Sequence, residues 1–92
     1  MPDHKITWSV YLIQCGDSSL YCGMSNDVLR RFSEHQSQSP KCAKYLRGKA
    51  PLELVYQMKI GTRSEAAREE IRIKSLTRAA KIKLISGILT DE

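Results

Sequence analysis

The fold of this chain is decided by one stretch near its start, Val10-Tyr11-Leu12-Ile13-Gln14-Cys15-Gly16-Asp17-Ser18-Ser19-Leu20-Tyr21-Cys22-Gly23. Apolar and aromatic runs lie on either side of a turn signal, which predicts two strands joined as a hairpin. If the turn closes on an odd number of residues, Tyr11 and Tyr21 project from the same face of the sheet. They would then lie roughly 5–8 Å apart. Two phenols so placed can bracket a water or a phosphate, or both can be ordinary half-buried strand residues.

The segment after the hairpin predicts a helix from about residue 27 to residue 37. Asn26 is a good N-cap, Asp27 suits the first turn, and Pro40 forbids continuation. The predicted apolar stripe consists of Val28, Leu29 and Phe32. Arg31 and His35 are four residues apart, so they lie on one flank of this helix. Arg30 points elsewhere and is expected to be solvated.

The order of these residues resembles the GIY-YIG nuclease superfamily, which includes homing endonucleases, some restriction enzymes and the incision domain of nucleotide-excision-repair nucleases. The first family tripeptide maps onto Val10-Tyr11-Leu12, and the second maps onto Tyr21-Cys22-Gly23. The family arginine falls on Arg31, and a histidine often found one helical turn later falls on His35. The segments 43–48 and 51–56 are similar to small stand-alone bacterial proteins that contain little beyond this domain. The resemblance covers roughly residues 8–84.

Length and composition are consistent with one compact unit. The 92 residues predict a single domain, 1–92, with its core at about 8–86 and loose ends at 1–4 and 90–92. No apolar run is long enough to span a membrane, and no secretion signal is evident. The odd cysteine count and the lack of close cysteine pairs favour free thiols in a reducing cytoplasm over disulfides or a zinc site. The three cysteines are Cys15, Cys22 and Cys42, the first two at strand positions.

The formal net charge is +5, and its placement predicts a nucleic-acid partner. Residues 41–49 contain four cations and no acid. The candidate binding residues of this basic loop are Lys41, Lys44, Tyr45, Arg47 and Lys49. The loop is either a phosphate-binding loop whose Tyr45 could stack on a base, or a solvated loop with a packed tyrosine. Further cations follow late in the chain at Arg72, Lys74, Arg78, Lys81 and Lys83.

The rest of the chain predicts a third strand and two more helices. The strand, about 52–60, alternates with one apolar face made by Leu52, Leu54, Tyr56, Met58 and Ile60. Thr62 and Glu65 form a capping box that opens a helix running to about 74 or 75. Thr77 caps a helix at about 78–86 that ends at Gly87. Its inward residues are predicted to be Ala79, Ile82 and Ile85. The expected fold is α+β, a small three-stranded antiparallel sheet flanked by helices.

Two adjacent acids on the capping-box helix are candidates for a metal ligand. Glu70 has apolar helical neighbours, whereas Glu69 neighbours Glu65 and Arg72, so Glu70 is expected to face the packed side and Glu69 the solvent. Glu70 is either a surface residue paired with Lys74 or a carboxylate that binds a cation. The resemblance favours the second, because the family's metal-binding glutamate lies on the helix after the third strand.

The resemblance, together with these features, implies a metal-dependent DNA endonuclease that is structure-selective or single-strand-selective instead of sequence-specific, with DNA repair or recombination as its expected process. Glu70 would anchor Mg²⁺ or Mn²⁺, and Arg31 would donate to the scissile phosphate. One of Tyr11 and Tyr21 would help to take the proton of the attacking water, and the other would orient it. His35 would relay a proton or hydrogen-bond the phosphate. The alternatives are a non-catalytic nucleic-acid-binding module and, more weakly, an RNA or ribosome partner; no obligate protein partner is evident.

Overall fold

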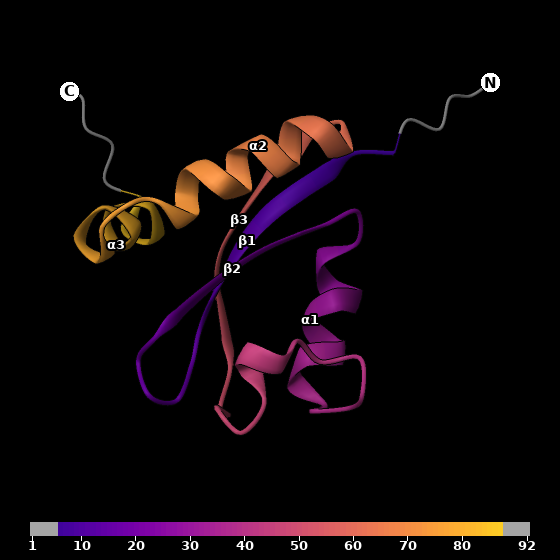
Figure 1. Ribbon diagram of the computed structural model, residues 1–92, viewed down its shortest axis with the longest axis vertical. Helices are drawn as coiled ribbons and strands as arrows, with labels where there is room; N and C mark the ends of the chain where they lie inside the picture. The colour runs from indigo at the N-terminus through magenta and orange to yellow at the C-terminus, as the bar shows by residue number, and fades with distance from the viewer. Residues whose placement is uncertain (1–5, 88–92) are drawn as a thin grey trace.

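In the computed structural model, residues 6–87 are described, and they form the expected α+β fold (Figure 1). The predicted loose ends at 1–4 and 90–92 lie outside this range. In chain order the elements are β1 (Trp8–Gln14), β2 (Leu20–Ser25), α1 (Val28–Gln36), the 3₁₀ turn η1 (Lys44–Leu46), β3 (Glu53–Gly61), α2 (Arg63–Lys74) and α3 (Arg78–Ser86).

The three strands form an antiparallel sheet in the order β2-β1-β3. Gln14 pairs with Leu20, so the loop 15–19 has five residues, the odd number that the hairpin prediction requires. Tyr11 lies opposite Gly23, and Tyr21 lies opposite Ile13. Tyr11 and Tyr21 therefore share one face of the sheet, as predicted, and both belong to the same apolar cluster.

Gly23 leaves the space that the Tyr11 ring occupies. A Cβ atom at position 23 would lie 2.5 Å from the phenolic oxygen of Tyr11, which is far inside contact distance. The absence of a side chain at Gly23 thus lets the tyrosine of the neighbouring strand lie across it. The two tripeptides of the hairpin form one packing unit.

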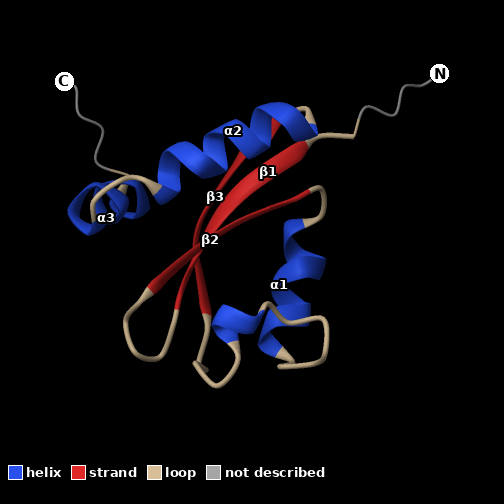
Figure 2. Cartoon of the chain, in the orientation of Figure 1, coloured by secondary structure: helices blue, strands red, loops and turns tan. Residues whose placement is uncertain are grey.

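Each face of the sheet carries its own apolar cluster. On the Tyr11 face, Ile13 packs with Val28 of α1 and with Leu46 of the basic loop. On the opposite face, Val10 and Leu12 pack with residues of α2 and α3; the buried helical residues there are Ala66 and Ile73. Figure 2 shows this division, with α1 on the other side of the strands from α2 and α3.

The prediction that β3 has a single apolar face is wrong, because the strand contains a bulge. Leu12 pairs with Tyr56 but the next residue, Ile13, pairs with Leu54, so Val55 is an extra residue. An inserted residue reverses the alternation of side chains beyond it. Leu52 and Leu54 accordingly pack on the Tyr11 face, whereas Tyr56 and Ile60 pack on the other, and Met58 is half exposed.

The helices begin and end close to the predicted residues, with three corrections. The N-cap of α1 is Asp27 instead of Asn26, because the Asp27 side chain accepts the backbone N–H of Arg30. Leu29 of the predicted stripe is exposed, since only Val28 and Phe32 reach the sheet. In α3 the packed residues are Leu84 and Ile85, while Ala79 and Ile82 are exposed.

Two cap predictions are confirmed. The capping box of α2 is present, with Thr62 and Glu65 each bonding the other's backbone N–H. Thr77 caps α3, and Gly87 ends it in the left-handed region at φ 72°. Among residues 6–87, no helix combines the length and apolarity that crossing a bilayer requires.

Candidate functional site

Tyr11 and His35 form the buried centre of the candidate site. The Tyr11 phenolic oxygen lies 3.1 Å from Nε2 of His35. Tyr11 keeps 2% of its surface exposed and His35 keeps none. The ring of Tyr21 meets the edge of the same imidazole, with centroids 5.8 Å apart. Three of the predicted site residues are therefore brought together by packing.

The hydrogen bonds of His35 fix its tautomer. The backbone N–H of Ala43 donates to Nδ1 over 3.3 Å, so Nδ1 carries no proton. Burial, with the charge of Arg31 adding to it, lowers the pKa of His35 to about 4, so the ring is neutral near pH 7. The single ring proton then resides on Nε2 and is donated to Tyr11. His35 is fully buried and both of its ring nitrogens are engaged, so neither nitrogen is free to bond a phosphate in this conformation.

Arg31 connects α1 to the basic loop. Its Nη1 atom donates to Glu34 over 3.0 Å and to the backbone oxygen of Lys41 over 2.7 Å. The hydrogen bond from Arg31 lowers the pKa of the Glu34 carboxyl, which stays ionised. The Arg31 side chain retains 30% of its exposure, so the guanidinium is held in place and still open to a substrate.

Both phenols of the hairpin are protonated near neutral pH. Burial raises the pKa of Tyr11, with the neighbouring Tyr21 adding to it and Arg31 opposing. Burial also raises the pKa of Tyr21, again with Arg31 opposing. The carboxylate of Glu70 adds to both increases, so its charge acts on the same two phenols as that of Arg31. Glu70 is thus electrostatically coupled to the predicted site although it lies on α2.

The predicted difference in burial between Glu69 and Glu70 is wrong. Their side chains retain 23% and 21% exposure, because basic residues of the same helix cover both. Arg72 hydrogen-bonds Glu69, and Lys74 lies 3.7 Å from Glu70. Glu69 instead acts on Tyr56, away from the two hairpin phenols. The two acids therefore differ in the tyrosines on which their charges act and hardly in their exposure.

Tyr45 of the basic loop is 45% exposed, but its ring is already engaged by two neighbours. One face of its ring stacks on Tyr21, with centroids 5.7 Å apart and planes at 23°. The Nζ atom of Lys49 covers the other face at 3.6 Å from the centroid, and Lys49 also pairs with Asp17. The expectation that Tyr45 stacks on a base is therefore not met in this conformation.

The other cations of the basic loop, Lys41, Lys44 and Arg47, are exposed and make no ion pair with any residue of the described range. Gln38, which the sequence reasoning missed, shapes this loop. Its side chain donates to the backbone oxygen of Leu46 and accepts from the N–H of Gly48 over 2.8 Å. In the sequence, its place in the polar run Ser37-Gln38-Ser39-Pro40 indicates only a turn; in the structure its φ is 56°.

A divalent cation fits this site only through a single carboxylate. The residues from 6 to 87 contain no cluster of three or more histidine, cysteine or acidic side chains suited to a metal. Mg²⁺ is satisfied by one or two carboxylates when water and substrate phosphate complete its shell. The Glu70 side chain retains 21% exposure and its charge acts on both phenols, so it fits that requirement if a cation replaces Lys74 as its partner. All three cysteines are buried free thiols, as predicted, with Cys15 directly after β1.

Comparison with known proteins identifies the family of this chain. The family model of the GIY-YIG catalytic domain matches residues 7–83. A UPF0213 protein of Cronobacter sakazakii is 51% identical over 85 residues, covering 92% of this chain and 87% of that protein. The UPF0213 protein YhbQ of Escherichia coli is 47% identical over 79 residues, covering 86% of this chain and 77% of its own length.

Two solution structures are similar in fold and sequence. The UPF0213 protein BH0048 of Bacillus halodurans is 38% identical, with a TM-score of 0.56 over 89% of this chain and 85% of that one. The protein EF2693 of Enterococcus faecalis is 32% identical, with a TM-score of 0.59 over 100% and 98%. The family match, the identity to these relatives and the shared fold lead to one conclusion: this chain belongs to the GIY-YIG nuclease superfamily, within its small UPF0213 group.

Proposed function

We propose that this protein is a metal-dependent endonuclease that hydrolyses phosphodiester bonds in DNA and selects its substrate by strand structure instead of base sequence. The observation that carries this proposal is the convergence of Tyr11, Tyr21, Arg31 and His35 on one face of the hairpin, within the electrostatic reach of Glu70. Binding alone would need only the cations. A surface that only binds nucleic acid has no need of a buried phenol that is hydrogen-bonded to a buried imidazole.

Hydrolysis of a phosphodiester requires that negative charge on the phosphoryl oxygens be stabilised. The Arg31 guanidinium is suited to this because its donors match two phosphate oxygens and its position is fixed by Glu34 and Lys41. A divalent cation on Glu70 would add Lewis-acid stabilisation and lower the pKa of a water bound to it. Mg²⁺ or Mn²⁺ suits the carboxylate donor.

Of the two phenols, Tyr11 is better supported as the group that takes a proton from the attacking water. The Nε2–H of His35 donates to the Tyr11 oxygen, a bond that no described residue makes to Tyr21, whereas the charge of Arg31 opposes the pKa increase of both phenols. Both interactions stabilise a phenolate more than a phenol. Tyr21 is placed beside the same imidazole and would orient the water or the phosphate. His35 acts through Tyr11 as a positioning residue.

The substrate proposal follows from the surface around the site. Lys41, Lys44 and Arg47 supply exposed positive charge next to Arg31, which favours a polyanion. The described residues present no recognition helix or second module that would read base edges, so tight base specificity is not expected. The buried free thiols are consistent with the proposed cytoplasmic location.

One observation favours a second candidate, a nucleic-acid-binding module without nuclease activity. Glu70 is already paired with Lys74, and both phenols have raised pKa values, so the site is not poised for hydrolysis without a cation. The two candidates differ in whether a cation displaces Lys74 from Glu70.

The test is a cleavage assay with single-stranded, duplex and branched DNA, in Mg²⁺ or in EDTA. Glu70→Gln is compared with Glu69→Gln, a matched control on the preceding residue with nearly the same exposure. The proposal predicts cleavage in Mg²⁺ that is lost in EDTA and in Glu70→Gln but kept in Glu69→Gln. Binding without cleavage in every arm would support the second candidate, and equal cleavage by all variants would reveal a contaminant.

A further inference from the structure

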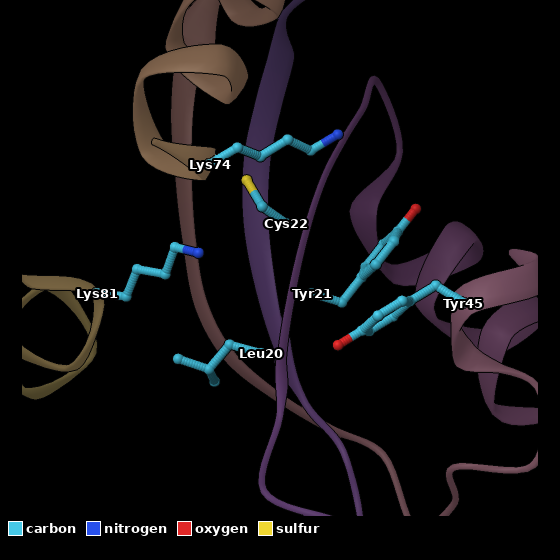
Figure 3. Close-up of a pocket in the computed structure, with 6 residues that line it drawn as sticks. All are labelled: Leu20, Tyr21, Cys22, Tyr45, Lys74 and Lys81. Carbon is cyan, nitrogen blue, oxygen red and sulfur yellow. The ribbon is translucent and has the colours of Figure 1, made fainter. Parts of the chain in front are cut away.

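A pocket of about 280 Å³ lies along the outer edge of β2, away from its pairing partner β1. It is lined by Leu20, Tyr21, Cys22, Tyr45, Lys74 and Lys81. Figure 3 shows Lys74 and Lys81 extending from the helices toward β2, with the stacked rings of Tyr21 and Tyr45 on the opposite side of the strand. The pocket thus joins the Tyr11 face of the sheet to the α2 and α3 side.

The ammonium groups of Lys74 and Lys81 give this pocket a positive charge. Burial raises the pKa of Cys22 to about 11, so its thiol is neutral; Glu70 adds to that rise, and Lys74 and Lys81 oppose it. Lys74 shares its charge with Glu70 at 3.7 Å. Lys81 forms no ion pair with any residue between 6 and 87. Lys74 is thus partly neutralised by Glu70, whereas no described residue neutralises Lys81.

The rings of Tyr21 and Tyr45 in the pocket already pack against neighbouring side chains, which disfavours the binding of a flat aromatic ligand. Tyr45 lies between Tyr21 and Lys49, and Tyr21 also meets the edge of His35. What remains is the pair of ammonium groups and the outer edge of β2, where an edge strand presents backbone amides to ligands. This chemistry fits a phosphate group.

We propose that this pocket is a second phosphate subsite, which binds the backbone phosphate next to the one held at Arg31, with Lys81 as its main cation and Lys74 as the cation it shares with Glu70. Tyr21 belongs both to the pocket and to the candidate site, so a strand that occupies one lies at the entrance of the other. The subsite rests on the nucleic-acid substrate of the proposed function. It extends the path of the strand past Tyr45 of the basic loop and around the β2 edge.

The test measures binding of a short oligothymidylate by fluorescence anisotropy over a range of salt concentrations, in EDTA. Lys81→Gln is compared with Lys59→Gln, an exposed lysine on β3 at the opposite edge of the sheet. Loss of one phosphate contact to a single strand should reduce the salt slope by about 0.7 and weaken binding about fivefold to tenfold at low salt. Lys59→Gln should match the wild type. An unchanged slope in Lys81→Gln would overturn the subsite.

Two further measurements separate the alternatives. The oligonucleotide should shift the amide NMR signals of Leu20, Cys22 and Lys81; equal shifts with inorganic phosphate would show a free-anion site and overturn the assignment to a strand. Failure of the nuclease proposal would appear as no cleavage in Mg²⁺ while the Lys81→Gln slope change persists. Failure of the subsite would appear as normal cleavage with no slope change.

Discussion

The two halves of the candidate site are built in different ways. On the hairpin side, Tyr11 and His35 are buried and hydrogen-bonded to each other, and the backbone N–H of Ala43 holds the other nitrogen of His35. On the α2 side, Glu70 and Lys74 meet as a surface ion pair, in which the lysine is 56% exposed. Packing fixes the first half before any ligand arrives, whereas the second half is free to exchange partners. A catalytic geometry that needs a cation would be completed on the α2 side.

The largest effect is expected at Arg31, the charged member of the rigid half. Arg31→Ala should lower the cleavage rate about 10²–10³-fold, because it removes a fixed donor to developing phosphate charge. Arg30→Ala is the matched control, since Arg30 precedes it on α1 and is exposed. Single-turnover cleavage measures both, with circular dichroism to confirm folding. An equal loss in the two variants would mean that general charge, not a positioned guanidinium, matters.

The next effect is a pH dependence of stability that arises from His35. Its pKa is lowered from 6.5 to about 4 in the folded protein, so the unfolded chain binds the proton more readily. Stability is therefore full above pH 6.5 and falls as the pH drops toward 4, by about 2–3 kcal/mol at pH 4.5. Urea unfolding near pH 7 and near pH 4.5 should show this loss in the wild type and a smaller one in His35→Gln. The same loss in both would place the titration elsewhere.

A substitution at Gly23 tests how closely the hairpin half is packed. Gly23→Ala should destabilise the protein by about 1–3 kcal/mol, because the new methyl group would collide with the Tyr11 ring. In a Tyr11→Leu background the same change should cost much less. Urea midpoints for the four proteins of this cycle give the coupling. Additive costs would show that the two positions do not share space.

The smallest effect is expected on the α2 side. Lys74→Gln should change the free energy of unfolding by less than about 0.5 kcal/mol, because exposed ion pairs contribute little. Urea unfolding near pH 7 measures it. A loss above about 1 kcal/mol would show that this half is held as firmly as the hairpin half, and the contrast between the two would disappear.

What the sequence predicts well is local. The hairpin, the shared face of Tyr11 and Tyr21 that follows if its loop is odd, and the Thr62 capping box each depend on residues close together in the chain. The Val55 bulge was not predictable, because the apolar alternation of the strand continues through it. The covering of Tyr45 by Tyr21 and Lys49 depends on tertiary contacts, as does the burial of His35. The near-equal exposure of Glu69 and Glu70 depends on which basic side chains fold over them.

The bulge in β3 also limits how this strand can pair incorrectly. Leu54 before the bulge and Tyr56 after it serve opposite layers of the molecule. A slip of one residue would turn both ends the wrong way at once, exposing apolar groups to water on each side. A strand shifted in this way would lose apolar contacts on both faces of the sheet, whereas a strand with one apolar face would lose them on that face alone. The irregularity therefore favours a single alignment of β3 on β1, the strand that carries Tyr11.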